Sequence, residues 1–192
     1  MRGKIGLRAA IIATALAWNA GMATAEDHTE IGPDVGGVAT QSRVRPMTPR
    51  LSALVAEASQ RSTTFHNLVT RIDDTDGVVY LVEQRCGVLN ACLLHAVRIA
   101  GPNRLLQINV DARKTDSSVM ASIGHELQHV VEVLSDPTIR SAPTMRLFYR
   151  LKCSLCGKEY ETDAAVRAGL RIGDELRSGP TPRTFARRQG GD

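Results

Sequence analysis

The chain has 192 residues, with 24 lysines and arginines against 20 aspartates and glutamates, and its formal net charge at pH 7 is +4. The first 25 residues contain three of the basic side chains and no acidic one, so the rest of the chain has a net charge of +1. This balance excludes an extensive basic surface, and we expect no nucleic-acid partner. A chain of this length usually folds as one domain around a single core.

The N-terminus has the layout of a secretory signal peptide. Three basic residues precede an apolar run over residues 9–18, and Ala23-Thr24-Ala25 forms an A-x-A cleavage site. The apolar run is too short to span a bilayer, and no later stretch reaches that length. We therefore predict that residues 1–25 are removed and that the protein is exported to the periplasm or the extracellular space. We expect no stable membrane insertion after this cleavage.

Residues 26–46 contain Gly32-Pro33 and Gly36-Gly37 but no periodic pattern, so we predict a mobile leader. The folded domain is predicted over residues 47–178. Within it, apolar residues recur three or four positions apart over residues 51–72, which indicates one bent helix or two consecutive helices.

Three β-rich runs follow, over residues 78–82, 91–100 and 105–110. A turn at residues 101–103 predicts that the second and third runs form a hairpin. His95 alternates in phase with the apolar residues of its run. We interpret it as an ordinary core or cleft-lining residue, because a single histidine in such a position more often has a structural role.

Residues 123–131 contain the pattern His125-Glu126-x-x-His129 on a helix predicted over about 115–134. Histidines four positions apart lie on one helix face, where both imidazoles can bind one Zn²⁺. The intervening Glu126 is placed to act as a general base. The helix's apolar residues fall on the opposite face: Ile123, Leu127, Val130, Val131 and Leu134. The sequence therefore predicts a zinc site on the polar face.

A catalytic zinc site usually has a third protein ligand. Glu132 lies on the same face but a turn further along, so we expect it to contact a ligand or to line the cleft rather than to bind the metal. A later helix is predicted over residues 161–176, and its core-facing stripe begins at Glu161, where an unpaired carboxylate would be costly to bury. The small Ala165 and Ala168 would let this helix approach the metal helix closely. Glu161 is therefore the predicted third ligand.

The chain contains four cysteines, which allow three disulfide pairings. Cys86 with Cys92 and Cys153 with Cys156 are the favoured pairs, because the members of each are close in sequence. Disulfides suit an exported protein, and a Cys₄ zinc site or a redox-active Cys153-x-x-Cys156 pair are the alternatives. A short helix is predicted over about 142–151, and residues 179–192 are predicted to be disordered.

The metal helix and the later helix together resemble the gluzincin branch of zincin metallopeptidases, in which a glutamate from a later helix joins His-Glu-x-x-His. The resemblance covers about 118–134 and the chain from about 159 onward. The predicted fold is α+β and zincin-like, with N-terminal helices, a small mainly antiparallel sheet, the metal helix and a C-terminal helix. Many gluzincins carry Glu-x-x-x-Asp, which here runs from Glu159 to Asp163. Glu159 thus remains an alternative to Glu161 as third ligand.

The resemblance implies a secreted zinc endopeptidase in which His125, His129 and Glu161 hold Zn²⁺ and Glu126 is first the general base and then the proton donor. An edge strand would receive an extended peptide or protein substrate. Tyr149 and Tyr160 are candidates, by position, for stabilising the oxyanion. Two other hypotheses are an inactive zinc-containing binding protein and an exported protein with a fortuitous motif that binds no metal.

Overall fold

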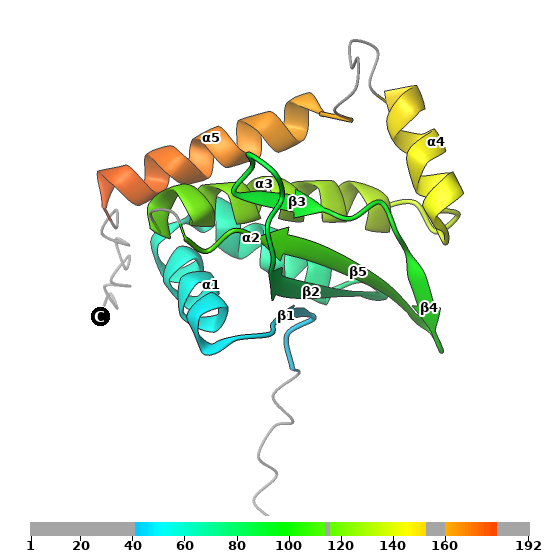
Figure 1. Cartoon of the computed structure of the whole chain (residues 1–192), viewed down its shortest axis with the longest axis horizontal. Helices are drawn as coiled ribbons and strands as arrows, with labels where there is room; N and C mark the ends of the chain where they lie inside the picture. The colour runs from blue at the N-terminus through cyan, green and yellow to red at the C-terminus, as the bar shows by residue number, and fades with distance from the viewer. Residues whose placement is uncertain (1–40, 114–115, 153–159, 180–192) are drawn as a thin grey trace, which may run out of the picture. The chain divides into compact units, whose positions relative to one another are not determined.

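The computed structural model of the chain describes residues 41–113, 116–152 and 160–179 (Figure 1). Several predictions from the sequence fall outside these residues. They concern the signal peptide, most of the leader, the tail from residue 180, and the residues Cys153, Cys156 and Glu159. The described part confirms an α+β architecture.

The strands of the described part form one mixed sheet. Strands β1 (Val44–Pro46), β2 (Gly77–Glu83) and β5 (Asn103–Val110) are parallel neighbours in that order. At the other side of β5, β3 (Ala91–Leu93) and β4 (Arg98–Ala100) pair antiparallel with successive parts of that strand. The expectation of a mainly antiparallel sheet is therefore wrong, because crossover connections bring β1, β2 and β5 into parallel pairing.

The predicted hairpin is confirmed, although its first arm is two short strands rather than one. Ala100 pairs with Asn103 across a two-residue turn, and Gly101, the first turn residue, has a φ of 57°. A glycine in that position suits the tight turns that connect twisted antiparallel strands. In this arrangement β3 lies at the edge of the sheet on the side away from β1. This edge is the one next to the site.

Helices α1 (Pro49–Arg61) and α2 (Thr63–Asp73) are two consecutive helices, with Ser62 between them. The Ser62 backbone N–H donates to the Ala58 carbonyl and closes α1, while its hydroxyl accepts from the Phe65 N–H and opens α2. One serine thus satisfies backbone groups of two helix ends. Of the two alternatives predicted from the sequence, one bent helix or two consecutive helices, the structure has the second.

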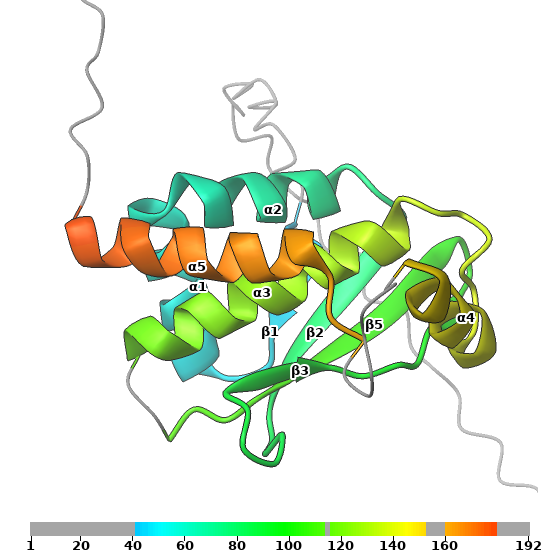
Figure 2. The ribbon, with the colours of Figure 1, turned by 90° about the horizontal axis from the view of Figure 1, so that it is seen from above.

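Helix α3 (Asp116–Leu134) packs against the sheet, and α5 (Asp163–Ser178) lies along the other side of α3 (Figures 1 and 2). Helix α4 (Ala142–Lys152) connects the end of α3 with the segment that precedes α5. Every residue of the predicted apolar stripe of α3 is buried: Ile123, Leu127, Val130, Val131 and Leu134. The opposite, polar face of α3 is consequently left for the site. Within the described residues, no helix has the length and apolar character to cross a membrane.

Small residues set a short distance between α3 and α5. Ala165 and Ala168 are buried, as predicted. A Cβ added to Gly124 would lie 2.2 Å from the Ile172 side chain, and one added to Gly169 would lie 3.1 Å from the Cβ of His125. The N-terminal end of α5 is thereby held close to the polar face of α3.

A buried arginine from β5 fixes the C-terminal end of α3. The Arg104 side chain is 2% exposed and pairs with Asp76 at 2.7 Å. Its guanidinium also donates to carbonyl oxygens at and beyond the helix end, those of Val133, Leu134, Asp136 and Ile139. These carbonyls lack partners within the helix, so a cation satisfies both their hydrogen bonding and the helix dipole.

Candidate metal centre

Three side chains with metal-binding atoms come together above the polar face of α3. They are His125, His129 and Glu161, and one ligand atom from each lies within 4.8 Å of the others. Glu161 Oε2 is 3.3 Å from His125 Nε2. Ligand atoms around a tetrahedral zinc lie about 3.4 Å apart, so modest side-chain rotation would close this group around one ion. The three predicted ligands thus form a group that can hold a metal ion.

Glu161 reaches this group from the connection before α5, not from the helix itself. Thr162 has an extended backbone and caps α5, accepting a hydrogen bond from the Ala165 N–H. The prediction that Glu161 begins the buried stripe of the helix is therefore wrong, and its side chain is 42% exposed. The apolar spacing of α5 extends in the sequence back to Glu161, although the helix itself begins after Thr162. An N-cap residue ends the helix without interrupting that spacing in the sequence.

Glu132 contacts the candidate ligand His129, which is one of the two positions expected for it. Its Oε2 lies 3.2 Å from His129 Nδ1, and its Oε1 accepts from the Thr162 hydroxyl at 2.8 Å. Burial alone would raise the pKa of Glu132, but the hydrogen bonds from His129 and Thr162 outweigh it and leave that pKa lowered. The contact occupies His129 Nδ1 and leaves Nε2 for a metal. Glu132 also links the helix that carries the histidines to the cap next to Glu161.

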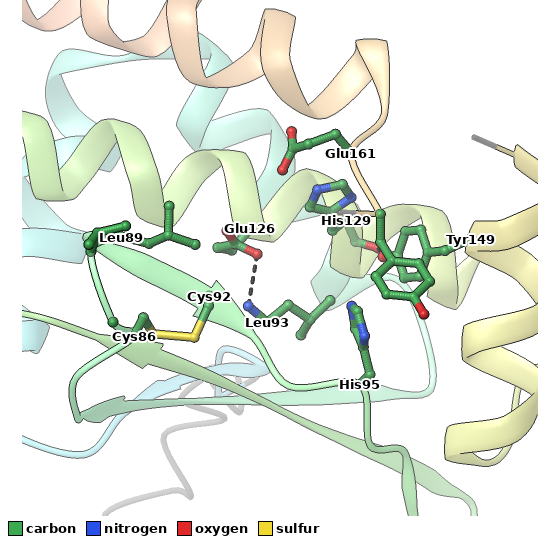
Figure 3. Close-up of a pocket in the computed structure, with 12 residues that line it drawn as sticks. Cys86, Leu89, Cys92, Leu93, His95, Glu126, His129, Tyr149 and Glu161 are labelled. Carbon is green, nitrogen blue, oxygen red and sulfur yellow. Dashed lines mark hydrogen bonds between the residues drawn. A yellow bond between two sulfur atoms is a disulfide. The ribbon is translucent and has the colours of Figure 1, made fainter. Parts of the chain in front are cut away.

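Glu126 lies beside the three candidate ligands and is nearly buried, with 9% of the residue exposed. Its Oε2 accepts a hydrogen bond of 2.8 Å from the backbone N–H of Leu93 in β3 (Figure 3). Burial raises the pKa of Glu126 to about 7. A carboxyl with such a pKa can accept and release a proton near neutral pH.

Burial lowers the pKa of His125, although the Glu161 carboxylate opposes this shift. The imidazole of His125 is therefore favoured in its neutral form, which is the form that binds metal ions. The backbone of α5 comes close on its Nδ1 side, at Gly169, while Nε2 is directed to Glu161.

A pocket of about 560 Å³ opens beside this group, and Glu126, His129 and Glu161 line it. Figure 3 shows the disulfide and Leu89 on one side of Glu126 and His95 with Tyr149 on the other. The Cys86–Cys92 disulfide confirms one of the two predicted local pairs. It closes a short loop that forms one wall of the pocket.

Aromatic rings form the opposite wall. The ring of His95 lies 4.7 Å from that of Tyr160 and 5.5 Å from that of Tyr149. Burial lowers the pKa of His95, with His129 adding to this effect. His95 is therefore a cleft-lining residue, and its proximity to the candidate metal group was not predicted from the sequence. His95 is two positions from Leu93, which predicts that both side chains point to the same face. This spacing indicates the site only when β3 is known to lie beside α3.

The two tyrosines differ in what their hydroxyl groups do. Tyr149 is buried, and its hydroxyl donates to the backbone carbonyl of His129 at 3.3 Å. Burial raises the pKa of Tyr149, so this hydroxyl keeps its proton. Tyr149 thus supports α3 at His129, and both Tyr149 and the half-buried Tyr160 line the pocket.

The chain was compared with protein-family models, with curated proteins and with solved structures, and none of the three comparisons gives a match.

Proposed function

We propose that the protein is an exported zinc-dependent endopeptidase. The observation that carries this proposal is the position of Glu126, a nearly buried carboxyl next to three converging ligand side chains in an open pocket. Metal binding alone requires no carboxyl at that position, whereas hydrolysis requires a base there. The disulfide adjacent to the pocket supports export, because disulfides persist in oxidising compartments.

Zinc is the metal that we propose for His125, His129 and Glu161. Two imidazoles and one carboxylate form a ligand set found in catalytic zinc sites, where a fourth position is left open. When bound, zinc polarises a carbonyl group and lowers the pKa of water. Glu132 would hold the His129 ring in the orientation that presents Nε2 to the ion.

Glu126 would move the proton in peptide hydrolysis. Its carboxylate accepts a proton from the attacking water as the new C–O bond forms. It then donates that proton to the leaving amine as the C–N bond breaks. The hydrogen bond from Leu93 holds the carboxyl in place for both transfers.

The edge of β3 would bind the substrate backbone. The Asn90 carbonyl accepts from the Asp111 N–H just after β5, and the Leu94 N–H donates to the Gln107 carbonyl in β5. By alternation, the N–H and carbonyl of Ala91 and the carbonyl of Leu93 point away from the sheet and toward the cleft, while the Leu93 N–H is engaged by Glu126. An extended peptide can add to such an edge, which would place its scissile bond beside Glu126. His95 and Tyr160 line the same cleft and are the described residues that we assign to stabilising the oxyanion.

The test compares the processed wild-type protein with its Glu126→Gln variant. The zinc content of each protein and its cleavage of a broad peptide library are measured. We expect both proteins to bind zinc and only the wild type to cleave peptides. Unchanged cleavage by Glu126→Gln would rule out its role as the base. Zinc binding without cleavage by the wild type would instead favour the inactive binding protein.

A further inference from the structure

A second pocket, of about 320 Å³, adjoins the metal group on the side of the disulfide loop. It shares His125, Glu126 and Glu161 with the metal centre. A substrate side chain within it would therefore lie next to the bond that the proposed reaction breaks. The proposed function does not assign a role to this pocket.

The outer walls of this pocket are aliphatic and come from two elements distant in sequence. Helix α5 contributes Val166 and Leu170, which are 42% and 64% exposed, and the disulfide loop contributes Leu89, which is 55% exposed. Exposing apolar side chains to water is unfavourable, yet all three of these side chains remain exposed at the pocket. Exposed apolar side chains that gather around a concave surface are typical of binding sites.

The base of the pocket is formed by small residues. Gly169 and Ala121 lie where α5 crosses α3, and a side chain at Gly169 would meet His125. The lining also includes Asn90 and Ser122, which are uncharged. The ionisable residues of the described lining are confined to the metal end, so the aliphatic end offers no opposite charge to a charged side chain. An apolar cavity of about 150 Å³ already accommodates a benzene ring, so there is room for a large apolar side chain.

The wall on the loop side is held in place despite its exposure. The Cys86–Cys92 disulfide closes the loop, and the Leu89 N–H donates to the Cys86 carbonyl at 3.1 Å. A wall that is ordered before binding loses less conformational entropy when a ligand arrives. Leu89 can therefore contribute to selection as well as to contact.

We propose that this pocket selects a large apolar side chain at a residue flanking the scissile bond, with Leu170 and Leu89 as the specificity-determining residues. The substrate class is thus peptides with an aliphatic or aromatic residue at that position. This inference rests on the proposed peptidase function. It concerns selectivity, which a peptidase with the same metal centre need not have.

The experiment uses zinc-loaded protein and matched peptides that differ only in leucine, serine or glutamate at the residues flanking one bond. We expect the wild type to prefer leucine over serine at one flanking position by about tenfold or more in kcat/KM. Leu170→Lys should bind the same amount of zinc, lose most of this preference and cleave the glutamate peptide relatively better. Leu147→Lys is the control, because Leu147 is an exposed leucine on α4 that lines neither pocket.

Cleavage by the wild type without preference at either flanking position would overturn this inference and leave the peptidase function standing. An unchanged preference in Leu170→Lys would overturn the assignment of the pocket. Zinc-loaded wild type that cleaves no peptide would overturn the peptidase function and the inference with it.

Discussion

The backbone N–H of Leu93 donates to the carboxylate of Glu126, so the edge strand of the sheet and helix α3 meet at the proposed base. Glu126 is thereby held at the same strand edge that would bind the substrate backbone. Because the donor is a backbone group, the orientation of Glu126 depends on the position of β3. The disulfide at Cys92, next to Leu93, fixes that position further.

Substituting Glu132 should weaken zinc binding without abolishing it. Glu132→Gln removes the charge that orients His129 and weakens the link to Thr162. Losses of this kind usually cost about 10- to 100-fold in metal affinity. Zinc affinity can be measured by competition with a chelator of known affinity. Glu57→Gln, on α1 and outside both pockets, should leave the affinity unchanged.

Gly169→Ala should disturb the metal centre although it favours the helix. The added Cβ would lie 3.1 Å from the Cβ of His125, so the ligand or the helix must shift. Replacing glycine by alanine within a helix otherwise stabilises it by about 1 kcal/mol. The matched control is Gly173→Ala, whose Cβ would meet Ala121 at 3.8 Å and the flexible end of Arg177.

We expect a several-fold loss of zinc affinity in Gly169→Ala only, measured beside the thermal stability of both metal-free proteins. Equal zinc affinities in the two variants would contradict the position assigned to His125 against α5.

Removing the Cys86–Cys92 disulfide should affect stability and selectivity more than metal binding. Closing so short a loop contributes about 2 kcal/mol by loop entropy. The Cys86→Ser and Cys92→Ser double variant should lose about that much free energy of unfolding, measured by denaturant titration. Its zinc content should remain that of the wild type, because neither residue belongs to the ligand group. A large loss of zinc would show that the loop supports the centre itself.

The Asp76–Arg104 pair should make the fold sensitive to acid. The hydrogen bond from Arg104 holds the pKa of Asp76 below its usual value. A lowered pKa in the folded state gives a stabilisation that is present above the unfolded-state pKa of about 4 and is lost as the pH falls through the folded-state value. Asp76→Asn should therefore be less stable than the wild type at pH 6.

The difference between the two proteins should shrink toward pH 3, in urea titrations across that range. Asp76 is partly exposed, so we expect only a modest difference. Parallel stability profiles over the whole range would contradict this role for the pair.

The sequence predicted the features that depend on local pattern. The buried stripe of α3 and the pairing of Cys86 with Cys92 depend on residues close together in the chain, and both are confirmed. The sequence also predicted that Glu161 lies near the histidines, on the assumption that it belongs to the buried stripe of the last helix. The cap at Thr162 shows that the helix begins after Glu161. A correct position was thus derived from an incorrect local structure.

Features that depend on distant segments were beyond the sequence. The parallel pairing of β2 with β5 follows from chain crossovers, which alternation of side chains does not specify. The aliphatic pocket requires Leu89 to face Leu170, and these residues are 81 positions apart. His95 likewise became a cleft residue only through the placement of β3 beside α3.

We propose that His125, His129 and Glu161 together hold one zinc ion. The most direct test is the zinc content of the purified processed protein, beside Glu161→Ala and Glu159→Ala, after equal exposure to zinc. We predict about one zinc per chain in the wild type and in Glu159→Ala, and a loss of zinc in Glu161→Ala. Loss of zinc in Glu159→Ala with retention in Glu161→Ala would contradict the ligand set, and no zinc in the wild type would contradict the account as a whole.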